Sequence, residues 1–147
     1  MQSKILKYAA LLKDKKISAV ELTAEYLKKI AEANARYNAF VSVDEERAMC
    51  FARLADKKIA DGTASALTGI PFGVKANIAE KGVETDCCSK ILKGYRPTYN
   101  ATVIEKLLAA GAVPMGKNNM DEFAMGSSTE TGIHGAAYNP VNTNYVT

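Results

Sequence analysis

The sequence predicts an α/β fold in which N-terminal helices pack on a partial, mostly parallel sheet. Residues 1–62 carry apolar side chains at helical spacing together with helix-capping signals. Residues 63–147 hold two short apolar runs that are typical of buried strands, 72–75 and 112–115, with a helical pattern between them. Because a strand, a helix and a second strand in this order favour a right-handed parallel crossover, the two strands are expected to pair.

Two helices and a short strand are expected first. Residues 4–14 form a helix, and a longer one follows Ser18 to about residue 35. Ser18 and Glu21 make a capping box, in which a hydroxyl and a carboxylate satisfy free backbone N–H groups. Helical spacing places on its inner face Val20, Ala24, Leu27, Ile30 and Ala31. Residues 38–43 alternate weakly and are predicted to be extended.

A third helix and the first core strand follow. Asp44 is placed to cap a helix that Gly62 ends. The predicted inner face of this helix comprises Ala48, Phe51, Ala52, Ala55 and Ile59. Residues 61–69 are a loop rich in small side chains, and the strand at 72–75 ends at a lysine.

The second half is less regular. Residues 79–100 are predicted to be irregular apart from a short helix at 89–92. Asn100 is expected to cap a helix that Gly111 ends and that buries Val103, Ile104, Leu107 and Leu108. The strand at 112–115 completes the pair. Two parallel strands leave exposed edges, so we expect the sheet to continue in residues outside this sequence.

Composition narrows the function classes. The chain has 147 residues, 48% of them hydrophobic, and a net charge of +3 that is spread along it, which does not demand a nucleic-acid partner. Its three cysteines include an adjacent pair and no C-x-x-C, which fits neither a disulfide framework nor a zinc site, and no metal site is expected. We see no signal peptide or membrane span, and a reducing, cytoplasmic setting is expected, with an organelle form that has lost its targeting segment left open.

Lys75 is the candidate catalytic residue. It ends the apolar run 69–75, so the strand would deliver its amine to the edge of a core. Burial strips water from an ammonium and lowers its pKa, which makes the neutral amine available as a base. The alternative, favoured by the local sequence alone, is a lysine that extends from the strand end into solvent.

A second candidate region follows the second strand. Gly126, Ser127 and Ser128 offer backbone N–H groups and two hydroxyls that could hold a polar substrate or an anion. Ligands bind at the carboxyl ends of parallel strands, so this segment and Lys75 could face one site. A helix-capping turn is the alternative.

Other polar residues are predicted to have structural roles. His134, the only histidine, is expected at the surface or in packing, because nothing in the sequence brings it to a cysteine. Cys87 and Cys88 are expected to be one partly exposed and one buried thiol. Asp121 and Glu122 are adjacent and would point apart, which favours capping or surface roles. No phosphate-binding loop occurs, so nucleotide binding by this chain is disfavoured.

Four stretches, 69–78, 89–92, 101–116 and 119–130, resemble the amidase signature family. Within it, the part from Met120 to Glu130 resembles the A-subunit branch of the aspartyl/glutamyl-tRNA amidotransferases. The likeness runs through essentially the whole chain. It implies that residues 63–147 are the first part of the amidase α/β core, which stops before a Gly/Ser-rich loop.

The resemblance implies a serine nucleophile, a second serine held through a cis peptide bond, and a lysine. Lys75 matches the lysine. The segment that matches the substrate pocket comprises Met125, Gly126, Ser127 and Ser128. Both catalytic serines would follow Thr147, so the fragment is expected to be inactive, and Ser127 and Ser128 are not taken as nucleophiles. Ala76 stands where family members usually have aspartate, which removes a polar partner near the amine.

The implied reaction is glutamine hydrolysis that supplies ammonia for amidation of Glu-tRNA(Gln) or Asp-tRNA(Asn). The implied partners are the B and C subunits, with tRNA held mainly by the B subunit. No cofactor is expected in this chain, and ATP and Mg are expected in the partner subunit. Two alternatives stay open: a non-catalytic scaffold fragment, and an amidase that acts on a small amide outside translation.

Overall fold

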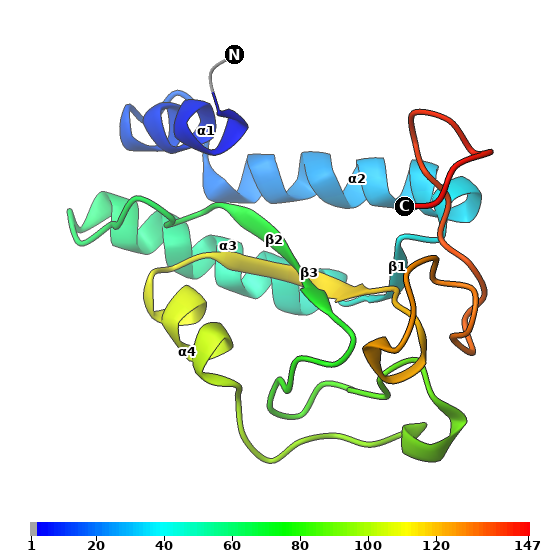
Figure 1. Ribbon diagram of the computed structural model, residues 1–147. Coiled ribbons are helices and arrows are strands. Elements are labelled where there is room, and N and C mark those ends of the chain that lie inside the picture. Colours follow the sequence, from blue (N-terminus) through cyan, green and yellow to red (C-terminus); the bar gives the residue numbers. More distant parts are fainter. Residues whose placement is uncertain (1–2) are drawn as a thin grey trace. The chain divides into compact units, whose positions relative to one another are not determined.

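The computed structural model describes residues 3–147 and confirms the α/β class (Figure 1). The helices are α1 (Lys4–Lys13), α2 (Ala19–Tyr37), α3 (Glu45–Ala60) and α4 (Thr102–Ala109), with 3-10 turns η1 (Lys90–Leu92) and η2 (Glu122–Ala124). The strands are β1 (Phe40–Val43), β2 (Pro71–Lys75) and β3 (Val113–Asn118). Among the described helices, none combines the length and the apolar character needed to cross a bilayer.

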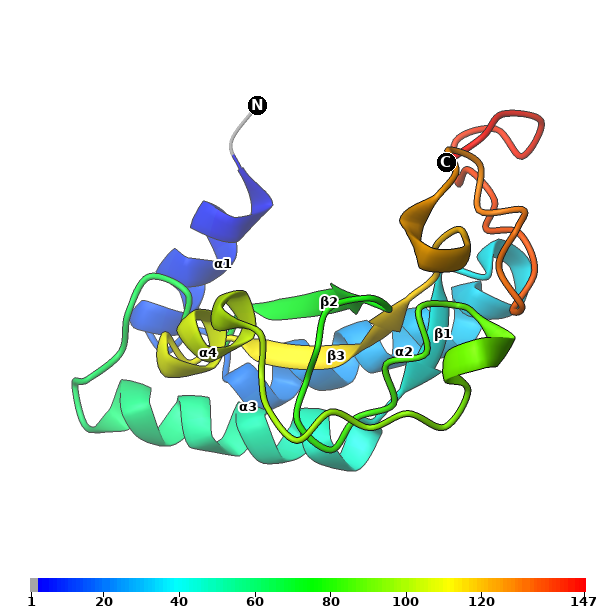
Figure 2. The same cartoon turned by 60° about the horizontal axis from the view of Figure 1, so that its bottom comes forward.

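The sheet has the order β1-β3-β2 and is mixed. β1 pairs antiparallel with β3, with Phe40 opposite Asn118. β2 and β3 run in the same direction (Figure 2). Backbone hydrogen bonds run from Val113 N to Ile70 O near the start of the pair and from Ala76 N to Asn118 O near its end, so residue numbers increase together along the two strands. The predicted parallel pairing of β2 with β3 is therefore confirmed, and β1 adds an antiparallel strand.

The chain divides into two compact units that interleave along the sequence. Of the described residues, unit 1 contains 3–29, 44–72 and 105–115, and unit 2 contains 30–43, 73–104 and 116–147. The sequence predicted a single boundary after residue 62. The two units share β2 and β3, because the first part of each strand belongs to unit 1 and the last part to unit 2.

Capping interactions fix the starts of α2 and α3. Ser18 and Glu21 form the predicted capping box, with Ser18 N donating to Glu21 Oε2 at 2.8 Å and Glu21 N donating to Ser18 Oγ at 3.0 Å. Asp56 of α3 also accepts from the backbone of Ala19 at 2.6 Å. Asp44 caps α3 as predicted, because its Oδ1 accepts from Arg47 N at 2.9 Å.

The predicted inner face of α2 is partly wrong. Ala24 and Ala31 are exposed, and the residues of this helix that are buried are Ala19, Leu22, Thr23 and Leu27. The face is rotated because the capping box and Asp56 fix the first turn with Ala19 inward. In α3, the predicted face is confirmed by the burial of Ala48, Ala52 and Ala55.

Two predictions around α4 are also wrong. Asn100 does not cap this helix, because its Oδ1 accepts from Lys81 N at 2.8 Å and α4 begins at Thr102. Val103 is 48% exposed, whereas Ile104 is buried as predicted. The helix is short, and its one fully buried side chain is that of Ile104.

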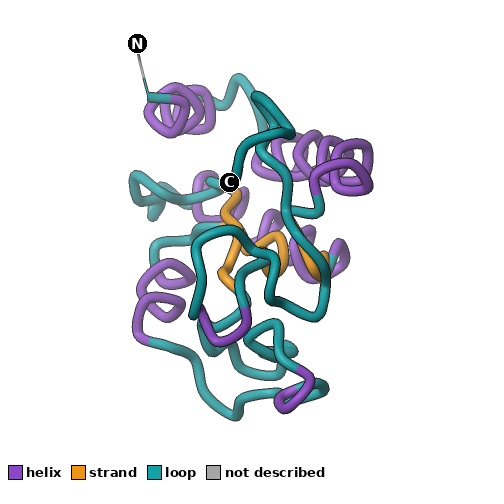
Figure 3. Tube along the Cα trace, turned by 45° about the vertical axis from the view of Figure 1, so that its right-hand side comes forward, coloured by secondary structure: helices purple, strands orange, loops and turns teal. Residues whose placement is uncertain are grey.

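Unit 2 is mostly irregular. Residues 76–101 and 119–147 are traced largely as loop, interrupted by η1 and η2 (Figure 3). A small apolar cluster of Ala76, Cys88 and Met120 lies within it. Such loops carry many backbone polar groups that have no ladder partner, so side chains must satisfy them.

Candidate functional site

Lys75 is the last residue of β2, and its side chain is exposed. Its neighbours Val74 and Ala76 are each 1% exposed. Successive strand side chains point to opposite faces, so the residues on either side of the lysine take the buried face. The predicted burial of Lys75 is therefore wrong for this structure, while its assignment as the family lysine stays a prediction.

Ala76 packs in the apolar cluster of unit 2. It lies beside Cys88 and Met120, and Val41 and Ala124 pack against the same cluster. A carboxylate at this position would be buried among apolar side chains. Ala76 therefore lies in an apolar environment.

The predicted pocket segment is an exposed loop after η2. Met125 is 80% exposed, Gly126 and Ser127 are exposed, and Ser128 is half-buried. An exposed methionine next to two serines presents both an apolar and a polar surface.

Asp121 shapes that loop from inside. Its carboxylate accepts from Ser128 N at 3.1 Å, from Thr129 N at 2.8 Å and from Thr131 Oγ1 at 2.9 Å. These bonds, led by that from Thr129, lower the pKa of Asp121. A Cβ on Gly126 would lie 2.3 Å from Asp121 Cγ, so only glycine fits beside the carboxylate. The predicted capping or surface role of Asp121 is therefore wrong, because its side chain is buried, makes no cap bond to η2 and instead holds the loop at residues 128–131.

Backbone strain is concentrated in two segments of unit 2. Seven non-glycine residues of the described chain have positive φ, and five of them lie at 87–88 and 123–129. These five are Cys87, Cys88, Phe123, Ala124 and Thr129. Strain of this kind persists only where surrounding contacts hold it, and it is common at functional sites. The two segments are bonded to each other, since Phe123 N donates to Cys87 O at 3.1 Å.

Sequence reasoning missed a buried ion pair. Lys117 and Glu80 are each 1% exposed, with Lys117 Nζ 3.7 Å from Glu80 Oε2. The ammonium also donates to Ile78 O at 2.6 Å and to Thr85 Oγ1 at 3.2 Å. The predicted strand ended at residue 115, but β3 continues to Asn118, and its alternation would have placed Lys117 inside.

Sequence reasoning also missed a second cluster. The side chains of Asp86, Cys88 and His134 bring their ligand atoms within 4.8 Å of one another. His134 Nε2 lies 2.6 Å from Asp86 Oδ2, so the histidine is paired with a carboxylate. Its side chain is 31% exposed, which agrees with the predicted position at the surface or in packing. No sequence spacing signals a contact over 48 residues.

The two adjacent thiols differ as predicted, because Cys88 is buried and Cys87 is half-buried. Burial raises the pKa of the Cys88 thiol to about 11 and also raises that of Cys87. The nucleophilic form of cysteine is the thiolate. Neither thiol is therefore activated, which argues against a cysteine–histidine hydrolase.

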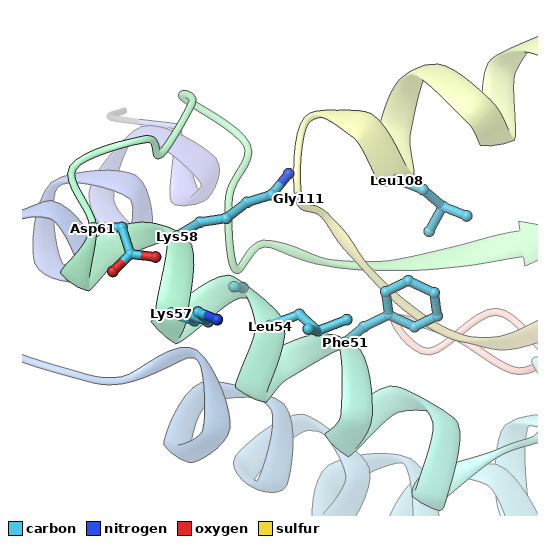
Figure 4. Close-up of a pocket in the computed structure, with 8 residues that line it drawn as sticks. Phe51, Leu54, Lys57, Lys58, Asp61, Leu108 and Gly111 are labelled. Carbon is cyan, nitrogen blue, oxygen red and sulfur yellow. The ribbon is translucent and has the colours of Figure 1, made fainter.

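An apolar cavity of about 390 Å³ lies in unit 1, and its lining includes neither Lys75 nor any of residues 125–128. Figure 4 shows Phe51 and Leu54 of α3 and Leu108 of α4 at one end, and Lys58 and Asp61 at the other. Lys58 Nζ donates to Ala109 O at 2.9 Å. The cavity offers apolar surface and no pair of groups suited to acid–base chemistry.

The amidase family model matches residues 21–147. The chain belongs to the amidase family. It is 47% identical over 138 residues to the A subunit of the glutamyl-tRNA(Gln) amidotransferase of Neisseria meningitidis, covering 94% of this chain and 29% of that protein. It is 52% identical over 133 residues to the protein of the same name from Brucella anthropi, covering 90% of this chain and 27% of that protein. The chain thus spans less than a third of the length of these relatives.

Solved structures agree on the fold. A protein described as part of a vestigial complex that reveals the origins of an s-triazine catabolic enzyme matches with a TM-score of 0.93 and 33% identity, covering 98% of this chain and 32% of that one. The peptide amidase of Stenotrophomonas maltophilia matches with a TM-score of 0.86 and 27% identity, covering 97% of this chain and 31% of that one. The predicted partial amidase signature fold is therefore confirmed for this chain.

Proposed function

We propose that this chain is part of the glutamine-hydrolysing component of a tRNA-dependent amidotransferase, which supplies ammonia for amidation of Glu-tRNA(Gln) or Asp-tRNA(Asn). The observation that carries the proposal is identity of 46–53% to proteins named as the A subunit of glutamyl-tRNA(Gln) amidotransferase, over 88–94% of this chain. The structural neighbours with other names are 26–33% identical.

The proposed roles follow the ends of two strands. Lys75 ends β2, and the loop with Met125, Gly126, Ser127 and Ser128 follows β3. In the proposed reaction, neutral Lys75 draws a proton through a bridging serine from a serine nucleophile, which makes a weak hydroxyl reactive. Backbone N–H groups of a glycine-serine loop stabilise the oxyanion. The exposed loop forms one wall of the glutamine pocket.

We propose further that the 147-residue chain alone does not hydrolyse glutamine. An exposed ammonium keeps its water, and the described residues do not bury Lys75. A base of this kind needs an apolar surrounding and a serine hydroxyl within hydrogen-bond reach. Both would come from sequence after Thr147.

The proposed assembly includes B and C subunits. In it, tRNA is held mainly by the B subunit, while ATP and Mg are bound in the partner rather than in this chain. The proposed location is the cytoplasm. The three free cysteines, Cys50, Cys87 and Cys88, support a reducing setting.

Ammonia release from glutamine tests the proposal. We expect no turnover from the 147-residue chain and turnover from a chain extended through the serine loop. Lys75→Ala should abolish that turnover, whereas Lys90→Ala, at another exposed lysine, should leave it unchanged. Turnover by the short chain that is lost on Lys75→Ala would overturn the inactivity, and an extended, folded chain without glutaminase activity would overturn the function.

The small-amide alternative is supported by neighbours named peptide amidase and 6-aminohexanoate cyclic dimer hydrolase. Those neighbours are less similar than the amidotransferase proteins. Profiling the extended chain against glutamine, peptide amides and cyclic amides separates the two functions. Co-elution of the short chain with B and C subunits, without hydrolysis, would support the scaffold alternative.

A further inference from the structure

Asp86, Cys88 and His134 form a cluster that the proposed glutamine hydrolysis does not use. Its members offer a carboxylate oxygen, a thiol sulfur and an imidazole nitrogen, all within 4.8 Å of one another. Asp86 and Cys88 are buried, and the side chain of His134 is 31% exposed. Oxygen, nitrogen and sulfur donors in this mixture are the set that Zn²⁺ uses in proteins.

Hydrogen bonds hold the ligand-bearing segments together. Cys88 N donates to Asp86 Oδ1 at 2.8 Å, which leaves Oδ2 to face His134. Ile133 N donates to Cys88 O at 3.0 Å, which ties the histidine segment to the cysteine segment. Asn38 Nδ2 donates to His134 O at 2.8 Å. Partners of this kind orient metal ligands.

Close backbone packing supports the same arrangement. A Cβ on Gly132 would lie 2.6 Å from Met120 O and 3.0 Å from Cys88 Cβ, so glycine is required for this approach. Cys87 and Cys88 have φ of 53° and 51°, a conformation that costs energy for residues with a Cβ. The fold therefore holds Cys88 in place at a cost in backbone strain.

A small cavity opens beside the cluster. It measures about 80 Å³ and is lined by Val41, Ser42, Glu84, Asp86, Lys117 and His134. A cavity of this size has room for an ion and a water molecule, because about 10–15 Å³ of such volume accommodates one water.

We propose that Asp86, Cys88 and His134 form a zinc site with its fourth position open to water. Zinc–ligand bonds of about 2.0–2.3 Å at tetrahedral angles place the ligand atoms roughly 3.3–3.6 Å apart. Asp86 and His134 must then separate by about 0.7 Å, and any pair at the 4.8 Å limit must close by about 1.3 Å. The partly exposed histidine ring has room for these shifts.

The charges and protons balance. The Cys88 thiol releases its proton to solvent as its sulfur binds, and the ion replaces the hydrogen bond between Asp86 and His134. A carboxylate and a thiolate together offset the two charges of the ion. Lys117 lines the same cavity, and the repulsion from its ammonium is reduced by its pairing with Glu80.

Cobalt titration of the 147-residue chain, reduced with a phosphine, tests the site. Tetrahedral Co²⁺ bound to a thiolate gives a sulfur-to-cobalt charge-transfer band in the near ultraviolet and intense visible bands. We expect both at one ion per chain, and their loss when Zn²⁺ is added. Absence of the charge-transfer band would overturn the proposal.

Matched variants show which residues bind. Cys88→Ser should remove the charge-transfer band, whereas Cys50→Ser and Cys87→Ser should retain it. His134→Ala, at a partly exposed position, should fold and weaken Zn²⁺ binding by at least roughly 100-fold, because loss of an outer-shell partner alone costs 10–100-fold. Retention of the band in Cys88→Ser, its loss in Cys50→Ser, or unchanged affinity in folded His134→Ala would each overturn the site. None of these readouts depends on glutamine hydrolysis.

Discussion

Replacing Lys117 with methionine should destabilise this chain more than any exposed lysine replacement. Methionine keeps most of the side-chain length and removes the ammonium. The ammonium donates to Ile78 O and Thr85 Oγ1 and faces the carboxylate of Glu80. Because both charged side chains are 1% exposed, the carboxylate that is left behind stays out of bulk water.

The size of the expected loss in stability depends on the carboxylate that stays buried after the substitution. Removing one partner of a buried ion pair costs about 3–5 kcal/mol, because the other charge stays buried without compensation. For a domain of this size that corresponds to a fall in melting temperature of roughly 6–20 °C. Total stabilities of about 5–15 kcal/mol mean that the variant could lose a large part of its margin.

Urea denaturation followed by circular dichroism measures the effect, with Lys90→Met as the matched control at an exposed site. The control should stay within about 0.5 kcal/mol of the parent. Adding Glu80→Gln to Lys117→Met removes the stranded charge and should recover about 1–3 kcal/mol. If Lys117→Met unfolds within about 0.5 kcal/mol of the control, the ion pair does not stabilise unit 2 and the reasoning is wrong.

Three further predictions concern caps and the loop after β3. Asp44→Ala should lower the free energy of unfolding by about 1 kcal/mol in urea titrations, because it removes the bond to Arg47 N that caps α3, and an unchanged midpoint would contradict the cap. Gly126→Ala should disrupt the loop around Asp121, seen as faster amide hydrogen exchange at residues 128–131, whereas equal exchange in parent and variant would show that the 2.3 Å approach is relieved elsewhere. The folded state lowers the pKa of Asp121, so the carboxylate stabilises the loop fully above its unfolded pKa of about 3.9, and this stabilisation is lost as pH falls through the lower folded pKa. Protection of the loop amides should therefore hold at pH 5 and fall below about pH 4. In Asp121→Asn this pH dependence should disappear.

Local signals in the sequence located the helices and two of their caps. A capping box at Ser18 and a cap at Asp44 act within one turn, so their chemistry is visible in a few neighbouring residues. The burial of α2 was harder, because Asp56 bonds to Ala19 from 37 residues away and fixes which side of the helix faces inward. Apolar spacing alone favoured Ala24, which is exposed.

The candidate site was also predictable from the sequence only in part. Contiguous motifs were enough to propose Lys75 and residues 125–128 as site residues. They could not predict the exposure of Lys75, because it depends on which face of β2 is covered. The network of Asp121 spans ten residues, and the contact between Asp86 and His134 spans 48. Such long-range contacts leave no periodic pattern in the sequence.

The two lysines near the ends of β2 and β3 are suited to opposite tasks. Lys117 is buried and contacts a carboxylate, a carbonyl and a hydroxyl, so its side chain ties segments of unit 2 together. Lys75 is exposed, and in the proposed reaction it acts as a base once residues outside this chain cover it. Ala76, which follows β2, packs beside Met120 in the apolar cluster, so its side chain offers the amine of Lys75 no polar partner. Under the proposed function, activity depends on covering Lys75, so the extended chain, rather than a further substitution in the short one, is the form in which to test it.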